Sequence, residues 1–420
     1  MVKPLKFCMV TTFYPPYSFG GDGMQVYRLS NELARRGHSV DVFYCEDSFL
    51  FMNGKHPEGD FPNHERVTLN PLRSGVGMLS PLLTQQTGIP IFKGRLKAAL
   101  EKNRYDVIHY HNMSLIGIAA LSYGAAVKLY TAHEHWLVCP MHILWKFNRE
   151  VCTAKSCTMC QLAGKRPPQL WRKTGLLDRM LGHVDCVISP SRFTMQKHLE
   201  MGLKAPIKCI PNFLPKPVDN ADTANEKPSA RPFFLFAGRL EFVKGAHRLI
   251  ELFKNHPEYD LKIAGDGPYR ESLEERAANC RNIEFLGRLS QEEIGIAYRS
   301  ALALIVPSIC YETFGMTIVE AFSNKTPVIA NDLGALPEII EESGGGYVYR
   351  SDEELILAVR KLASDAPLRA ELGQNGHRAF LKYWNEEPHL EQYFTLIESL
   401  RTQKKPVQES AREVGTSAIA

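Results

Sequence analysis

The sequence predicts an α/β protein of two domains, each a parallel sheet with helices on both faces. Three observations support this prediction. The chain has 420 residues, beyond the size at which one hydrophobic core usually stops growing. Short apolar runs alternate with segments of helical spacing in both halves, as in βαβ units. A polar, proline-rich stretch at 213–232 separates the halves and has the composition of a linker.

The first half begins in the way a Rossmann-like domain begins, with a strand, a glycine loop, a helix and a second strand. The strands are expected at 6–13 and 39–44, and the helix at 24–36. In the loop between them, Gly20 and Gly21 would let backbone amides approach a ligand at the amino terminus of the helix.

The remainder of this half continues the alternation of strands and helices. The segment 49–91 is polar and rich in proline and glycine, and its order cannot be assigned. His133 follows a short strand and lies at its carboxyl end, where ligands of doubly wound sheets bind. The other expected elements are strands at 106–110, 128–131, 184–189 and 208–211, and helices at 94–102, 114–127, 171–181 and from Ser191.

The second half repeats the pattern from a new first strand. Residues 1–212 and 233–384 should therefore form two Rossmann-like α/β/α domains that face each other across a central cleft. A helix at 385–400 and a disordered tail at 401–420 should follow. The expected strands are 233–237, 261–264, 283–286, 301–306 and 327–330, and the expected helices are 246–254, 269–278, 291–299, 353–363 and 367–383.

The stretch 307–320 joins a buried strand to a helix and contains two glutamates and a glycine. Glu312 lies in the expected turn, Gly315 at the start of the helix and Glu320 inside it. At such a strand end, the free amides around Gly315 could hold a phosphate. Glu320 could then bind the hydroxyls of a ribose, and Glu312 the hydroxyls of the group that the phosphate carries.

Two cations follow the first strand of the second half, in the segment 238–245. Arg239 and Lys244 would face the turn at 307–320 and clamp a diphosphate. Cations aimed at a leaving diphosphate would stabilise the negative charge that develops on it, without a metal ion. The sequence contains no Asp-x-Asp motif, which agrees with a site that needs no metal.

Together, these motifs resemble the donor site of the family-4 retaining glycosyltransferases, enzymes of the GT-B fold. The resemblance extends over about nine-tenths of the chain. It implies transfer of a hexosyl unit from a nucleotide-diphosphate sugar, with UDP favoured over GDP, by a retaining front-face mechanism. In that mechanism an oxygen of the leaving phosphate assists deprotonation of the acceptor. The acceptor implied is a glycan, a lipid-linked glycan or a polyol.

The resemblance also implies a role for each matching residue. Thr313 and Phe213 stand where the family usually has glycine, so the identity of the sugar stays open. The resemblance implies that Arg239 and Lys244 bind the diphosphate, that Glu320 binds the ribose and that Glu312 contacts the transferred sugar. It implies that the backbone of Gly315, Met316 and Thr317 contacts the sugar and the phosphate. It also implies that Gly20 and Gly21 lie near the phosphates and the acceptor, and that His133 contacts the donor sugar and supports catalysis.

Two other interpretations compete with this one. The chain could be another GT-B enzyme, such as a nucleotide-sugar epimerase or a phosphorylase, but the paired glutamates together with Arg239 and Lys244 count against that. It could also be a non-catalytic nucleotide-sugar-binding protein, which the intact catalytic positions disfavour.

Four of the ten cysteines fall within a short window, at Cys139, Cys152, Cys157 and Cys160. The last two have a spacing suited to chelation. Three interpretations stay open, namely structural zinc, an iron–sulfur cluster or reduced thiols. The spacing is not that of a ferredoxin, which lowers the iron–sulfur option.

The charge distribution and the chain start suggest where the protein works. The net charge is +4, but residues 144–208 contain twelve Lys and Arg against four Asp and Glu. Such a basic stretch attracts an anionic membrane surface or a phosphorylated acceptor, and the alternative is a solvated face. The start of the chain lacks signal-peptide architecture and no apolar run matches a membrane span. We expect a cytoplasmic enzyme, peripheral at the inner membrane face, with no nucleic-acid partner.

Overall fold

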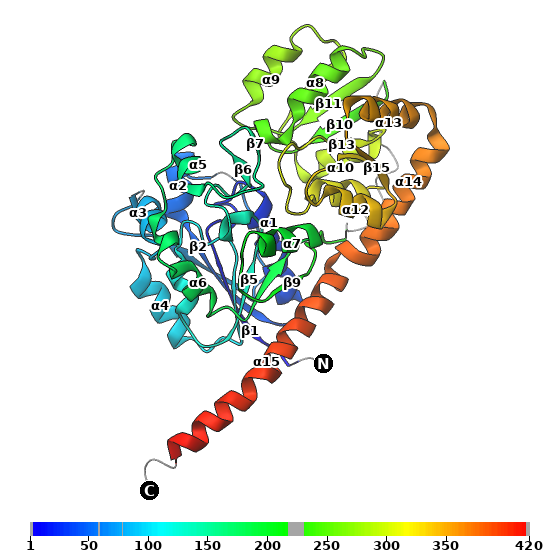
Figure 1. The fold of residues 1–420 in the computed structure, drawn as a ribbon. Coiled ribbons are helices and arrows are strands. Elements are labelled where there is room, and N and C mark those ends of the chain that lie inside the picture. Colours follow the sequence, from blue (N-terminus) through cyan, green and yellow to red (C-terminus); the bar gives the residue numbers. More distant parts are fainter. Residues whose placement is uncertain (1–2, 58, 78, 217–230, 417–420) are drawn as a thin grey trace.

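The computed structural model describes residues 3–57, 59–77, 79–216 and 231–416, with the backbone alone for 405–416. Two α/β domains lie one above the other, and a long helix at the carboxyl end runs from the upper domain along the lower one (Figure 1). The expected two-domain architecture is confirmed. Most of the predicted linker, 217–230, lies outside the described residues.

The amino-terminal domain contains a seven-stranded sheet in which every pair of neighbouring strands is parallel. Its central strands, at 6–11, 107–110 and 127–131, are almost wholly buried because helices cover both faces, so they appear in the sequence as largely apolar runs. The order across the sheet is β3 (Val67–Leu72), β2 (Ser39–Cys45), β1 (Lys6–Thr11), β4 (Val107–Tyr110), β5 (Val127–Thr131), β8 (Cys186–Ser189) and β9 (Ile207–Cys209).

The carboxyl-terminal domain contains a six-stranded sheet, again parallel throughout. In both sheets the chain reverses its direction of winding beside the first strand, which creates a crevice at the carboxyl ends of the strands. The order is β12 (Ile283–Gly287), β11 (Asp260–Ala264), β10 (Phe233–Ala237), β13 (Leu304–Val306), β14 (Val328–Asn331) and β15 (Gly346–Tyr349).

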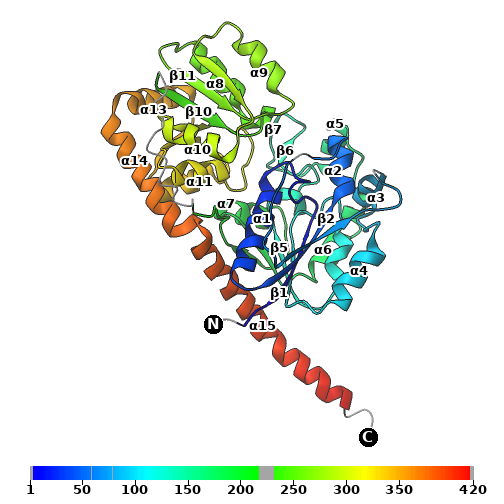
Figure 2. The same cartoon turned by 180° about the vertical axis from the view of Figure 1, so that it is seen from behind.

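The helices follow the strands and cover the two sheets, as Figures 1 and 2 show from opposite sides. In the first domain they are α1 (Gly21–Arg35), α2 (Glu46–Asn53), α3 (Leu79–Thr87), α4 (Lys93–Lys102), α5 (Cys157–Ala163), α6 (Leu176–Leu181) and α7 (Arg192–Glu200). In the second they are α8 (Ala246–Lys254), α9 (Arg270–Ala277), α10 (Gln291–Ser300), α11 (Met316–Ser323), α12 (Leu336–Ser343), α13 (Asp352–Ser364) and α14 (Ala366–Ala379).

The predicted helix at 114–127 is wrong. The chain forms only a short 3-10 helix there, Ile118–Ser122. Gly117 and Gly124 flank it with φ of 109° and 70°, values that glycine adopts freely and that end a helix. A Cβ at Gly117 would lie 2.8 Å from the backbone nitrogen of Pro90, so close packing also requires glycine.

The segment 49–91 contains more structure than its composition indicates, with the end of α2, strand β3 and helix α3. The predicted helix at 171–181 is divided in two. A 3-10 turn, Leu170–Lys173, precedes α6, and Gly175 between them has φ of 72°. That glycine forces a change of direction that apolar spacing does not reveal.

The carboxyl-terminal helix is α15 (Glu386–Thr416), which is longer than predicted. The predicted tail at 401–420 is therefore wrong as far as 416, and 417–420 lie outside the described residues. Arg401 pairs with Asp106 at 3.4 Å, and Lys404 with Asp185 at 2.6 Å. These ion pairs tie the helix to the first domain beyond the point where its apolar periodicity ends.

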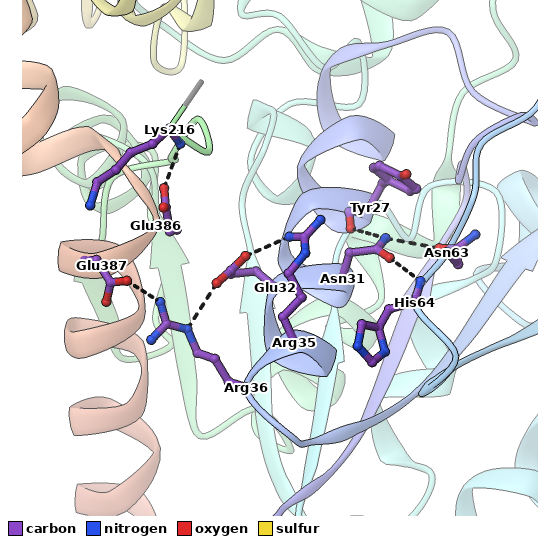
Figure 3. Close-up of polar contacts among 10 residues, drawn as sticks. All are labelled: Tyr27, Asn31, Glu32, Arg35, Arg36, Asn63, His64, Lys216, Glu386 and Glu387. Atoms are coloured by element: carbon purple, nitrogen blue, oxygen red, sulfur yellow. Dashed lines mark hydrogen bonds and ion pairs between the residues drawn. The ribbon is translucent and has the colours of Figure 1, made fainter. Parts of the chain in front are cut away.

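The start of α15 is also held by the first domain. Arg36, just after α1, donates to Glu32 at 3.2 Å and to Glu387 at 2.8 Å (Figure 3). Glu386 accepts from the backbone amide of Lys216, where the first domain ends. The helix thus belongs to the first domain in space although it follows the second in sequence. Within the described part of the chain, no helix combines the length and apolarity needed to cross a bilayer.

Candidate active site between the domains

The two central loops of the second domain meet at the carboxyl edge of its sheet, because β10 and β13 are neighbours. The Lys244 ammonium lies 2.6 Å from Glu312 Oε1, and the Ser308 hydroxyl donates to the same oxygen at 2.6 Å. Gly245 allows this approach, since a Cβ there would lie 2.0 Å from the Pro307 carbonyl oxygen. The structure thus joins two residues that were singled out from separate segments of the sequence.

This pair carries opposite charges under partial burial, with 30% of the Lys244 side chain and 19% of the Glu312 side chain exposed. Burial acts to lower the pKa of Lys244, but Glu312 outweighs it and the pKa is raised. Burial acts to raise the pKa of Glu312, but Lys244 and Ser308 hold it below the ordinary value. Both groups are therefore charged at neutral pH.

Arg239 does not join this pair. Its guanidinium bonds Glu241 of the same loop at 2.7 Å, and 56% of its side chain is exposed. An exposed surface ion pair of this kind contributes little free energy. Arg239 is therefore free to exchange Glu241 for an anionic ligand at small cost.

Glu320 projects from α11 toward the first domain. Its carboxylate accepts from the Tyr298 hydroxyl at 3.2 Å and lies 3.7 Å from the guanidinium of Arg28 on α1. Burial raises its pKa, although Arg28 and Tyr298 act to lower it. Arg28 was not predicted, because a contact between domains depends on their packing and leaves no local sequence pattern.

The start of α11 also touches the first domain. Gly315 precedes the helix with φ of 133°, a conformation that disfavours a side chain. The amides of Met316 and Thr317 lie in the first turn, where no intrahelical carbonyl is available to accept from them. The Gln25 side-chain amide donates to the sulfur of Met316 at 3.0 Å. A ligand at these amides would therefore lie between the two domains.

His133 follows β5 as the half-buried end of a row of histidines whose other members, His109 and His111, are buried. Its Nε2 lies 3.0 Å from Nδ1 of His111, and the centroid of the His111 ring lies 4.0 Å from that of the tilted His109 ring. Nδ1 of His109 in turn lies 2.9 Å from the hydroxyl of Tyr393 on α15. Burial, aided by His389, lowers the pKa of His133 to about 3. Its imidazole is therefore neutral and acts through hydrogen bonds.

The glycine loop places an acidic side chain that the sequence analysis passed over. Gly20 and Gly21 have φ of 105° and 47° and lead into α1. The next side chain, Asp22, accepts from the Asn112 amide at 2.9 Å. Burial and the nearby Glu134 raise the pKa of Asp22 to about 6. The signal was available, since Asp22 directly follows the two glycines.

Thr313, one of the two departures from the expected pattern, lies at the contact between the domains. Its hydroxyl donates to the His133 carbonyl at 2.9 Å. Its own carbonyl accepts from the hydroxyls of Ser191 and Thr194, at 2.7 and 2.9 Å. Glycine at 313 could not make the first of these bonds. The Thr313 side chain therefore couples the Glu312 loop directly to the His133 strand.

Phe213, the other departure, is fully buried where the first domain ends. Its ring lies 4.6 Å from that of His389 on α15, and its carbonyl accepts from the Gln25 side chain at 3.1 Å. A side chain here fills the space between α1 and α15 that glycine would leave open.

The four clustered cysteines line one small pocket with Lys146 and Trp145. A two-stranded hairpin, β6 (Trp145–Lys146) and β7 (Glu150–Val151), forms one wall and α5 the other. Burial raises the pKa of Cys139 to about 11. The thiols suit zinc in number and kind, but among the described residues no three His, Cys, Asp or Glu side chains are arranged to hold a metal ion. Metal binding here stays a prediction.

Replacing Cys157 by serine is expected to lower the unfolding temperature. It should also weaken binding of the acceptor more than binding of the donor. The reason is that the pocket orders an insertion which follows His133 on the first-domain side. Unfolding curves and donor titrations of the variant check this, and a loss of donor affinity alone would contradict it. Elemental analysis distinguishes the causes: less than about a tenth of an equivalent of zinc and of iron leaves only packed thiols.

The two sheets, their facing loops and the ionic pair at the second-domain edge define an enzyme of the GT-B fold that transfers sugars. Two family models match the chain in succession. Glycosyltransferase Family 4 matches residues 19–216, and Glycosyl transferases group 1 matches residues 218–379. The chain belongs to the family-4, group 1 glycosyltransferases.

Curated relatives span several sugars. Glycogen synthase of Mycobacterium tuberculosis is 28% identical over 86% of this chain and 86% of its own. O-antigen chain mannosyltransferase C of Escherichia coli is 23% identical over 94% of this chain and 98% of its own. Sulfoquinovosyl transferase of Arabidopsis thaliana is 30% identical, but the match spans only 36% of this chain and 31% of that relative.

Solved structures share the fold at low identity. Sucrose-phosphate synthase of Thermosynechococcus elongatus superposes with a TM-score of 0.70 at 21% identity, covering 95% of this chain and all of that one. An Anabaena protein, Alr3699/HepE, solved with UDP and glucose, has a TM-score of 0.61 at 18% identity and covers 97% of this chain and all of its own.

Proposed function

We propose that the protein transfers a hexosyl unit, with retention of configuration, from a UDP-sugar to a glycan, a lipid-linked glycan or a polyol. The observation that carries the proposal is the contact of Lys244 with Glu312 beside the amino terminus of α11. A cation and free backbone amides on one side suit a diphosphate, and a carboxylate beside them suits the hydroxyls of a sugar. UDP is favoured over GDP because the Anabaena neighbour was solved with UDP.

The reaction needs charge stabilisation more than proton transfer at the donor. As the bond to the sugar breaks, negative charge builds on the leaving diphosphate. Lys244 is positioned to bind this charge, and Arg239 can turn from Glu241 to join it. Glu320 would accept from the ribose hydroxyls in place of Tyr298. Lys244 and Arg239 supply the positive charge themselves, so a metal ion at the donor is unnecessary in this proposal.

On the acceptor side, the neutral His133 would donate to or accept from a sugar hydroxyl without adding charge. His111 orients it through the bond between their ring nitrogens. Asp22 would accept a hydrogen bond from another hydroxyl of the acceptor and so position the acceptor, while the leaving phosphate oxygen takes the one proton of the hydroxyl that attacks. A carboxylate with a pKa of about 6 is ionised under ordinary conditions yet retains affinity for a proton.

Transfer should therefore weaken as the pH falls through about 6, because protonated Asp22 no longer accepts the hydrogen bond. Asp22→Asn should lower transfer and abolish this limb of the pH profile. Because the folded protein raises this pKa, the ionised carboxylate costs stability above the folded pKa. The same variant should therefore unfold at a higher temperature than wild type at pH above 7. An unchanged acid limb in Asp22→Asn would contradict the assignment.

The proposed reaction is tested by incubating the full chain with a panel of UDP- and GDP-sugars in EDTA and analysing the products. We expect release of nucleoside diphosphate from a UDP-sugar without added metal, and a product with the anomeric configuration of the donor. An inverted product would refute the retaining mechanism. Activity that only Mg²⁺ or Mn²⁺ restores would refute metal independence, whereas restoration by Zn²⁺ alone would point to the cysteine pocket.

A further inference from the structure

Exposed large apolar side chains are gathered on one side of the first domain. Of the sixteen that the described residues contain, eleven lie between 51 and 170. Isolated exposed apolar residues are ordinary, but a concentration of this kind marks an interaction surface. We call this surface the apolar face, and its members are Phe51, Met52, Val76, Leu79, Leu82, Leu83, Ile89, Ile91, Met159, Leu162 and Leu170.

The elements that carry the apolar face are joined to one another. Helices α2 and α3 pack together, and α3 also packs on the 3-10 turn Leu170–Lys173. Gln86 of α3 and Gln161 of α5 both donate to the carbonyl of Pro167, at 3.4 and 3.3 Å. Figures 1 and 2 show α2, α3 and α5 side by side at the same edge of the domain. The elements that carry the apolar face therefore adjoin one another at one edge of the domain.

The stretches that carry eight of its eleven members are strongly basic. The stretches 79–104 and 155–173 contain a single acidic residue, Glu101. Nine of their Lys and Arg residues are exposed: Lys93, Arg95, Lys97, Lys102, Arg104, Lys155, Lys165, Arg166 and Lys173. Apolar side chains that insert between headgroups, ringed by cations that pair with phosphates, are the combination that binds interfaces of anionic lipid.

We propose that the apolar face docks the enzyme on an anionic membrane surface. The face consists of separate short helices with outward apolar side chains, which suits shallow insertion into a fluid layer. A second copy of the chain fits poorly, because a two-fold contact through this face would place the nine exposed cations of one copy against the same nine cations of the other.

The apolar face is also connected to the catalytic loops, which links it to the acceptor. Phe19, beside the two loop glycines, stacks on Phe49 of α2 at 4.7 Å. The last turn of α2, directly after Phe49, exposes Phe51 and Met52. A lipid-linked acceptor entering from the membrane would thus meet the loop that carries Asp22. This step rests on the proposed function, whereas docking on the membrane does not.

The test is sedimentation of the full chain with vesicles of phosphatidylcholine, alone or mixed with phosphatidylglycerol. We expect binding to the mixed vesicles, loss of binding in high salt, and binding by Leu79→Glu weaker by about tenfold or more. Leu357→Glu is the matched control, since both leucines are 61% exposed and Leu357 lies on α13 of the other domain. The control should bind as wild type does.

Two results would overturn the proposal. One is that the wild-type chain does not sediment with the mixed vesicles. This includes the case in which the wild-type chain forms a dimer that the Leu79→Glu substitution dissociates. The other is equal binding by Leu79→Glu and Leu357→Glu. Donor hydrolysis in detergent-free buffer should be the same in both variants, because neither residue touches the site. Loss of vesicle binding with intact hydrolysis therefore separates this surface from the proposed reaction.

Discussion

Replacing Lys244 by alanine is expected to lower the rate of sugar transfer by about a hundredfold or more. The ammonium contacts Glu312 at the turn before α11, and it would face the charge that develops on the leaving diphosphate. The measurement is kcat and kcat/KM for the donor. The unfolding temperature should change by only about 2–4 °C, since the ion pair of Lys244 and Glu312 is partly exposed at the carboxyl ends of the strands.

The matched control is Lys254→Ala. Lys254 is exposed at the end of α8, the helix that follows the Lys244 loop, so its loss removes the same charge from the same region. That variant should keep wild-type kinetics. Full activity in Lys244→Ala, or an equal loss in both variants, would contradict the role of Lys244 in binding the diphosphate.

Glu312→Ala and Glu320→Ala should separate turnover from binding. Glu312 would contact the reacting sugar, so its loss should lower kcat by on the order of a hundredfold. Glu320 would contact the ribose, which changes little between ground and transition states, so its loss should mainly raise KM. Steady-state kinetics with varied donor distinguishes the two.

Ser308→Ala is the control for Glu312, because it removes one hydrogen bond to the carboxylate but leaves the pair with Lys244. We expect an effect smaller than that of Glu312→Ala. If Glu312→Ala raised KM and Glu320→Ala lowered kcat, the donor would have to lie in the opposite orientation.

Most of the second domain was predictable from local pattern, but α12 and β15 were not among the expected elements. The strand at 233–237 and the helix at 246–254 have the predicted boundaries. They are the buried run and the strongly amphipathic helix of an ordinary βα unit, so local pattern and tertiary packing agree. The helix predicted at 114–127 failed because Gly117 and Gly124 act through φ and close contact, which apolar spacing does not register.

The site was predictable where its residues follow strand ends. Lys244 and Glu312 come from loops after neighbouring strands, so their contact follows from the topology of a doubly wound sheet. Arg28 and His111 could not be found in this way. Arg28 contacts Glu320 across the domain contact, and His111 contacts the ring of His133. No local sequence pattern encodes either arrangement.

The terminal helix illustrates a different limit. Its apolar periodicity ends near 400, but Arg401 and Lys404 hold it to the first domain through Asp106 and Asp185. Ion pairs between residues distant in sequence cannot be paired from the sequence alone. The polar composition therefore predicted disorder where tertiary contacts support a helix.

The proposed reaction depends on a metal-free site around Lys244 that cleaves a nucleotide-diphosphate sugar. Its most direct test is the release of nucleoside diphosphate from UDP-sugars by wild type, Lys244→Ala and Lys254→Ala, all in EDTA. We expect release by wild type and Lys254→Ala, and a rate lower by about a hundredfold or more for Lys244→Ala. Equal release by all three proteins, or none by wild type from any donor, would contradict it.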